Sequence, residues 1–140
     1  CLPFLLFLLW RHYSPKSKGI DMSTNIIEKL YEILKQRKGA DAKESYTASL
    51  YAEGSEKIAE KVLEEAQEFV DEAFLLDNTP NDQVVQRNIR AECADLIFHM
   101  LVMLAHHDVP PEDVFAVLEE RFGISGYEAK TKPEAIVIKE

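Results

Sequence analysis

The sequence predicts an all-α fold, a helical bundle of four main helices. Apolar residues recur at intervals of three and four, which is the spacing that gives a helix one apolar face. No stretch shows the sustained alternation of apolar and polar residues that is typical of a half-buried strand. The 140 residues, of which 46% are hydrophobic, are enough for one domain with its own core.

The charge of the chain limits its classes of partner. The formal net charge is −9, and no basic patch is rich enough for broad nucleic-acid binding. We therefore expect no nucleic-acid partner, and an anionic substrate would need local Lys and Arg or a bound metal. The two cysteines, Cys1 and Cys93, form no disulfide framework, and we expect Cys93 to be a small buried residue. Since nothing requires an oxidising compartment, we expect a cytoplasmic location.

The first residues differ in character from the rest of the chain. The apolar run over residues 2–10 is shorter than the roughly 20 residues that a membrane-spanning helix needs. It also lacks the basic start and the cleavage site of a signal peptide. Met22 precedes two good helix-capping residues. We expect residues 1–21 to be a non-native or disordered leader, residues 22–140 to form the domain, and the membrane not to be a partner. The alternative is a membrane-associated N-terminal anchor.

A first amphipathic helix is expected over residues 25–38. Its apolar positions keep helical spacing, basic residues occupy its last turn, and a glycine follows. The next stretch, residues 40–54, is expected to be a loop. It carries Ser45, Tyr46 and Ser49, whose hydroxyl groups either contact a polar ligand or cap helices and pack.

Three further helices are expected. The second covers about residues 55–76, and a polar turn joins it to the third, at about residues 83–107. The third helix has so broad an apolar surface that it must be buried centrally or at a subunit interface. The fourth helix begins at a pair of prolines, which a first turn tolerates. Its expected core stripe consists of Val114, Phe115, Val117, Leu118 and Phe122.

The second and third expected helices each carry a polar stripe, because residues three or four apart in a helix lie on one face. On the second helix the stripe consists of Lys57, Lys61, Glu65, Glu68 and Glu72. On the third helix it consists of Asn88, Glu92, Asp95 and His99.

Four carboxylates converge if these stripes face each other: those of Glu65, Glu68, Glu92 and Asp95. Such a cluster repels itself unless a cation sits inside it, and hard oxygen ligands at this spacing suit Mg2+ or Mn2+. The simpler interpretation is that both helix faces are solvated. Against that interpretation, Asp95 lies in a strongly apolar stretch, where an unpaired acid would be costly.

Several neighbouring residues have two interpretations. Glu64 points about a quarter-turn away from the carboxylates, so it is either an extra ligand or a base. Lys57 and Lys61 either grip phosphate oxygens or are ordinary surface lysines. His99 either contacts the substrate, supports the metal ligands, or is a core histidine with its hydrogen bonds satisfied. Arg121 either binds phosphate or interacts with a helix dipole.

A series of short motifs resembles a known family. Glu64–Glu68, followed after a gap by Glu92–Asp95, is similar to the E-E-x-x-E … E-x-x-D signature of the all-α nucleotide pyrophosphohydrolases, the MazG-like superfamily. The flanking segments narrow the resemblance, which spans about residues 26–130, to the phosphoribosyl-ATP pyrophosphohydrolase family. These segments are Ser45–Leu50, Gly54, Lys57–Ile58, Lys61, Ala94–His99, Glu112–Val114 and Arg121–Gly126. Departures at Cys93 and Pro110 do not touch the expected site.

The resemblance implies a homodimeric, Mg2+-dependent hydrolase that cleaves the α–β phosphoanhydride of phosphoribosyl-ATP, the second step of histidine biosynthesis. It implies metal binding by Glu65, Glu68, Glu92 and Asp95, with Glu64 or Glu65 as the base. The substrate would be bound by Lys57, Lys61, Ser45, Tyr46, Ser49, His99 and Arg121. Two rival predictions are a housecleaning nucleotide pyrophosphohydrolase of the same superfamily and a non-enzymatic helical interaction module.

Overall fold

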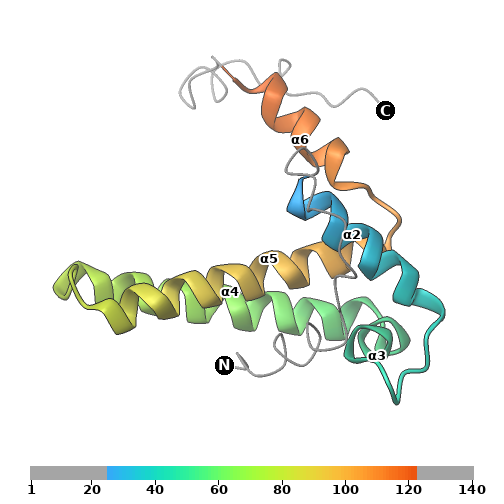
Figure 1. The fold of residues 1–140 in the computed structure, drawn as a ribbon, viewed down its shortest axis with the longest axis horizontal. Helices are drawn as coiled ribbons and strands as arrows, with labels where there is room; N and C mark the ends of the chain where they lie inside the picture. Colours follow the sequence, from blue (N-terminus) through green and yellow to red (C-terminus); the bar gives the residue numbers. More distant parts are fainter. Residues whose placement is uncertain (1–24, 123–140) are drawn as a thin grey trace, which may run out of the picture.

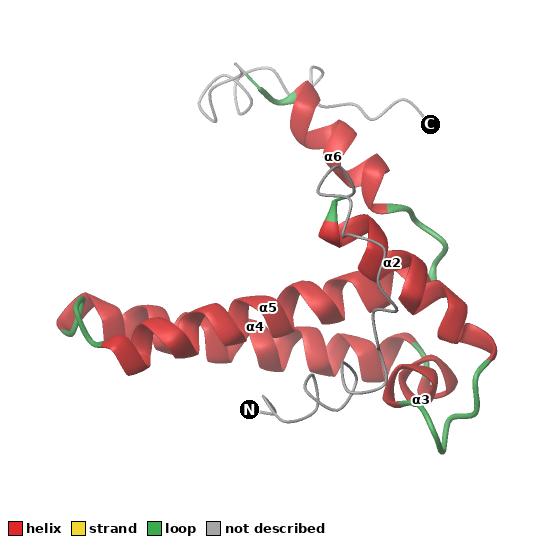
Figure 2. Ribbon diagram, in the orientation of Figure 1, coloured by secondary structure: helices red, strands yellow, loops and turns green. Residues whose placement is uncertain are grey.

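The computed structural model describes residues 25–122, and every regular element in that range is helical (Figure 1, Figure 2). The all-α prediction is therefore confirmed. The elements are α2 (Ile26–Gln36), the 3₁₀ helix η1 (Arg37–Gly39), α3 (Tyr46–Glu53), α4 (Ser55–Asn78), α5 (Gln83–His106) and α6 (Pro111–Glu120). The expected leader over residues 1–21, and the chain from residue 123 onward, lie outside the described residues.

The two longest helices, α4 and α5, form an antiparallel hairpin (Figure 1). Each has 24 residues, and a short turn joins them. The carboxylate of Asp82 ends this turn by accepting hydrogen bonds from the backbone N–H groups of Val84 and Val85, at 2.9 and 3.2 Å. This cap satisfies two of the donors that a helix start leaves open. None of the described helices is long and apolar enough to cross a bilayer.

The core lies where α2 and α3 meet the base of the hairpin, at its end away from the turn (Figure 1). Ile58 of α4 and Val102 and Ala105 of α5 are completely buried there. The Tyr51 hydroxyl donates a hydrogen bond of 2.9 Å to the Leu34 carbonyl, which ties α3 to α2. The cluster consists of Tyr31, Leu34, Leu50, Ile58, Phe98, Leu101, Val102 and Ala105.

The prediction of a loop over residues 40–54 is wrong in its second half, which forms α3. Ser45 is the N-cap of this helix and accepts a hydrogen bond of 3.3 Å from the backbone N–H of Ala48. Gly54 ends it with a φ of 86°, a conformation that favours glycine. The helix is short and draws its stability from packing, since Thr47 and Leu50 are buried.

A closed bundle of four helices is not confirmed. In Figure 1 the turn end of the α4–α5 hairpin extends away from α2, α3 and α6. Helix α6 packs against α2, and the prediction of an apolar core stripe on α6 is wrong for three of its five residues. Val114, Leu118 and Phe122 are exposed because no other described helix covers that side.

Candidate active site

The two polar stripes face each other across the α4–α5 hairpin. Toward the turn, the Asn88 amide donates to Glu72 at 3.5 Å. In the middle, one carboxylate oxygen from each of Glu65, Glu68 and Glu92 lies within 4.8 Å of the others. The facing arrangement follows from hairpin pairing, because the stripe of each helix keeps the three- and four-residue spacing of one face.

The converging carboxylates are largely hidden from solvent. Only 2% of the Glu65 surface and 4% of the Glu92 surface are exposed. The Oε2 atom of Glu65 is buried and has no hydrogen-bond partner among the described residues. An unsatisfied buried carboxylate oxygen is costly, so the arrangement is poorly explained as a solvated acidic face.

Electrostatic repulsion adds to this cost. Burial, and then the charges of Asp95 and Glu68, raise the pKa of Glu65 to about 8. Burial also raises the pKa of Glu92. Asp95 is 3% exposed, and burial followed by the charges of Glu92 and Glu68 raises its pKa to about 6. These acids therefore resist simultaneous ionisation at neutral pH. A cation among them would offset both the free-energy cost of burying their charges and the repulsion between them.

The chemistry of these donors fits a hard divalent cation. Carboxylate oxygens are the ligands that Mg2+ and Mn2+ favour. Three of the four predicted ligands, Glu65, Glu68 and Glu92, offer oxygens to a single point. Asp95 is not one of the three, although its charge acts on Glu65 across the hairpin.

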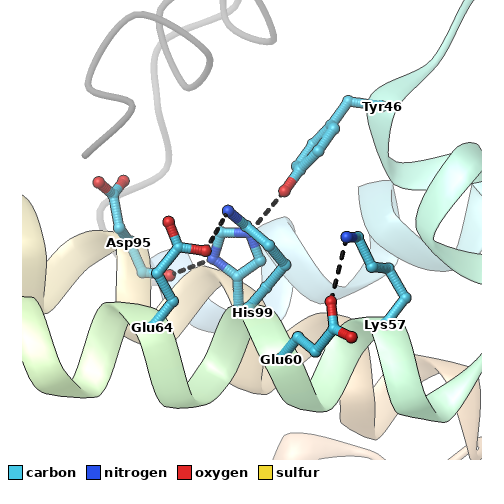
Figure 3. A network of polar contacts seen from close by, with 7 residues as sticks. Tyr46, Lys57, Glu60, Glu64, Asp95 and His99 are labelled. Atoms are coloured by element: carbon cyan, nitrogen blue, oxygen red, sulfur yellow. Dashed lines mark hydrogen bonds and ion pairs between the residues drawn. The ribbon is translucent and has the colours of Figure 1, made fainter.

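Two lysines lie on the same stripe of α4 as the acids, nearer to the end of the hairpin that lies away from the turn. The Nζ atom of Lys61 lies 2.7 Å from Oε2 of Glu64, and its side chain is only 12% exposed. Burial is the largest single influence on the pKa of Lys61 and lowers it, but the hydrogen bond to Glu64 and the charges of Tyr46, Glu64 and Glu65 together raise it by more. The net shift is upward, so Lys61 stays cationic. Lys57 pairs with Glu60 at 3.1 Å on the exposed surface (Figure 3).

Tyr46 reaches from α3 to His99 on α5, beside the acids (Figure 3). Its hydroxyl lies 3.0 Å from Nε2 of His99, while Nδ1 of the same ring lies 2.7 Å from the backbone carbonyl of Asp95. Burial lowers the pKa of His99 and raises that of Tyr46, so both groups are neutral at pH 7. The imidazole is 5% exposed.

The remaining predicted site residues are divided between two places. The Ser45 hydroxyl caps α3, and the Ser49 hydroxyl donates 2.6 Å to the Tyr46 carbonyl, so both lie near the site but hold α3 itself. Arg121 is exposed at the end of α6, which Figure 1 shows directed away from the α4–α5 hairpin. Within one chain, Arg121 is not brought together with the acids.

The structure adds Glu72 to the predicted acids. Its Oε2 atom is buried without a hydrogen-bond partner among the described residues, and its Oε1 atom accepts from Asn88. The signal was present in the sequence, because Glu72 follows Glu68 by four residues on the same stripe. Cys93, expected to be buried, is a half-buried free thiol.

This fold and site define an all-α protein with a buried carboxylate centre suited to a divalent cation, formed between two long antiparallel helices. Comparison with known proteins identifies the family to which the chain belongs. The family model described as phosphoribosyl-ATP pyrophosphohydrolase matches residues 27–122, which is most of the chain. The chain belongs to this family.

Curated relatives agree with this assignment. The chain is 42% identical over 106 residues to a protein of Geobacter metallireducens named phosphoribosyl-ATP pyrophosphatase, covering 76% of this chain and 90% of that protein. It is 44% identical over 105 residues to a protein of the same name from Cereibacter sphaeroides, covering 75% and 94%. A third, from Hydrogenovibrio crunogenus, is 42% identical over 109 residues, covering 78% and 93%.

Proposed function

We propose that this chain hydrolyses phosphoribosyl-ATP to phosphoribosyl-AMP and pyrophosphate, the second step of histidine biosynthesis. The observation that carries the proposal is the buried convergence of Glu65, Glu68 and Glu92 in a member of this family. Phosphoanhydride hydrolysis develops negative charge on phosphate oxygens, and a metal held by carboxylates is a common means of stabilising that charge.

The proposal assigns Mg2+, or Mn2+ as a substitute, to the carboxylates of Glu65, Glu68, Glu92 and Asp95. The orphaned Oε2 atom of Glu65 and the raised pKa of Asp95 support a cation at this point. When bound, the metal neutralises phosphate charge and lowers the pKa of an attacking water.

The side chains around the metal site take complementary roles in the proposal. Glu64 or Glu65 accepts a proton from the attacking water. The water oxygen bonds to one phosphorus of the α–β link, the bridging P–O bond breaks, and pyrophosphate leaves. Lys57 and Lys61 bind phosphate oxygens, a role supported by the cationic state of Lys61. On the substrate side of the site the proposal places Ser45, Tyr46, Ser49 and Arg121, with His99 behind Tyr46 as a supporting residue.

A homodimer belongs to the same proposal. Large apolar side chains are exposed on both long helices, including Leu63 at 71%, Phe74 at 64% and Met100 at 48%. Several large apolar side chains exposed on two neighbouring helices support an interface there. Sedimentation of the purified chain should therefore show a dimer, and a stable monomer would contradict it. The cytoplasm is the proposed location because the substrate is an intracellular nucleotide derivative.

The decisive experiment is a pyrophosphate-release assay with phosphoribosyl-ATP, with and without Mg2+, run beside dCTP and dUTP. Mg2+-dependent release from phosphoribosyl-ATP alone is the expected result. Release from a deoxynucleotide instead would assign the chain to a housecleaning role at the same site. No release from any substrate would overturn the enzymatic proposal in favour of an interaction module.

A further inference from the structure

The hydrogen bonds around His99 fix where its proton lies. The backbone carbonyl of Asp95 can only accept, so the Nδ1 atom 2.7 Å away carries a hydrogen. In a neutral imidazole Nε2 is then an acceptor, and the Tyr46 hydroxyl at 3.0 Å must be its donor. Tyr46, His99 and the Asp95 carbonyl therefore form one directed chain of hydrogen bonds from α3 to α5.

This chain of hydrogen bonds uses all the polar capacity of the imidazole. Both ring nitrogens are occupied and the residue is 5% exposed. The ring also packs edge-to-face against Tyr46 and Phe98, with ring centroids 6.0 and 5.1 Å away. A substrate atom could reach a nitrogen of His99 only by breaking one of these bonds. A role in contacting substrate is therefore a poor fit for His99.

Tyr46 is held just as firmly at its backbone end. The Ser49 hydroxyl donates 2.6 Å to the Tyr46 carbonyl, and the Ser45 hydroxyl caps the same turn. The first turn of α3 is thus locked internally and joined through Tyr46 to the turn of α5 that carries Asp95. This places one end of α3 in a defined position beside the carboxylates of Glu65, Glu68, Glu92 and Asp95, which together are called the acidic centre below.

We propose that Tyr46 and His99 are positioning residues: their hydrogen bond sets the first turn of α3 relative to the carboxylates of α4 and α5. The inference rests on the proposed hydrolysis of phosphoribosyl-ATP and deepens it. The pair aligns bound substrate with the acidic centre, so its loss lowers kcat through misalignment rather than through a lost substrate contact.

The chain contains a matched control on the same helix. The Tyr51 hydroxyl also donates a hydrogen bond to another helix, 2.9 Å long, to the Leu34 carbonyl. This bond joins α3 to α2 and has no part in the acidic centre. Tyr51→Phe removes the same atom from the same helix. It should lower the melting temperature while leaving kcat and KM of the folded protein unchanged.

The test is a double-mutant cycle on the full chain with Tyr46→Phe and His99→Asn. Each single change should lower kcat about ten- to a hundredfold with little change in KM. The double variant should lose no more than the worse single variant, because both changes break one unit. His99→Gln keeps an acceptor for Tyr46 near the Nε2 position, so it should recover most of the activity that His99→Asn loses.

A nitrogen-detected NMR spectrum of the imidazole provides a readout independent of turnover. The expected spectrum shows the Nδ1–H tautomer, with an Nε2 signal that moves in Tyr46→Phe and not in Tyr51→Phe. An Nε2–H tautomer would overturn the inference, as would losses in kcat that multiply in the double variant. If the wild-type protein releases no pyrophosphate, the proposed function itself fails; if wild type is active and the cycle is multiplicative, only the positioning role fails.

Discussion

Lys61 and Glu64 form a close ion pair one turn apart on α4, with 2.7 Å between Nζ and Oε2. Glu64 is not one of the three carboxylates that converge, whereas its neighbour Glu65 is. Adjacent helix positions differ by about 100° in direction, which explains why the two glutamates have different surroundings. The two candidate bases are therefore held differently: Glu64 is paired with a lysine, and Glu65 lies among the other acids.

Replacing each glutamate by glutamine should separate their roles. Glu65→Gln removes a buried ionisable carboxyl group from the acidic centre and should lower kcat/KM by about a hundredfold or more. Glu64→Gln keeps an acceptor for Lys61 and should lower it by less than about tenfold. Steady-state kinetics of pyrophosphate release measure both. The reverse order of the two losses would identify Glu64 as the base.

Glu68→Gln should abolish turnover while helicity, followed by circular dichroism, stays at the wild-type level. The change keeps the shape of the side chain but removes one of the three charges that face a single point. Mn2+ affinity, measured by calorimetry, should fall in parallel. Glu60→Gln is the matched control, because Glu60 lies on the exposed surface of the same helix and pairs with Lys57. Near-normal activity of Glu68→Gln would remove Glu68 from the metal site.

The acidic centre should make the stability of the metal-free protein depend on pH. The pKa of Glu65 is raised from 4.5 to about 8, so the folded state binds this proton more tightly than the unfolded state. Its contribution to stability is complete below about pH 4.5 and is lost as the pH rises through about 8. The free energy of unfolding of wild type should therefore fall, relative to Glu65→Gln, between about pH 5 and 8.

Magnesium should reverse this loss. Metal binding needs ionised carboxylates, so the rise in melting temperature on adding Mg2+ should be larger at about pH 8 than at about pH 5. Denaturant unfolding and thermal melts with and without Mg2+ measure both effects. Parallel stability profiles for wild type and Glu65→Gln would show that Glu65 does not titrate in this way.

The glycine between α3 and α4 should be intolerant of a side chain for conformational reasons alone. Gly54 has a φ of 86°, and a Cβ added there would meet no atom within 4 Å. Gly54→Ala should destabilise the fold by about 1–3 kcal/mol, because an L side chain strains this backbone conformation. Gly39→Ala, at a position with equal space and no positive φ, should leave the free energy of unfolding nearly unchanged. Urea-induced unfolding of both variants measures the two effects. Equal effects of the two changes would contradict this account.

The long helices and their polar stripes were predictable because their signals are periodic and local. The spacing that puts Glu65 and Glu68 on one face holds in any helix, and the capped turn before α5 implies a hairpin. Helix α3 was not predictable in this way. Its eight residues show no strong one-sided apolar pattern, and the buried ones include the polar Thr47, so tertiary packing decides its conformation.

The residues of the acidic centre were predictable from the sequence, but their hydrogen-bonded contacts were not. The sequence indicated which residues share a face, including Glu72 and Asn88, but it could not indicate that these two would be hydrogen-bonded or that an oxygen of Glu72 would be buried. The bond between Tyr46 and His99 was likewise invisible, since it joins residues 53 positions apart on separate helices. Contacts of this kind depend on how α3 docks, and no local pattern encodes that.

Insertions should have different effects in the two long helices and in the turn that Asp82 caps. All the converging carboxylates lie within the two arms of one hairpin, so their alignment depends on the number of residues between each acid and the turn. One residue added inside either arm would rotate the acids beyond it by about 100° and disperse the centre. Residues added in the exposed turn, before the Asp82 cap, would lengthen a loop and leave both arms paired. A library of such insertions would map the acidic centre as a region of lost function bounded by a permissive loop.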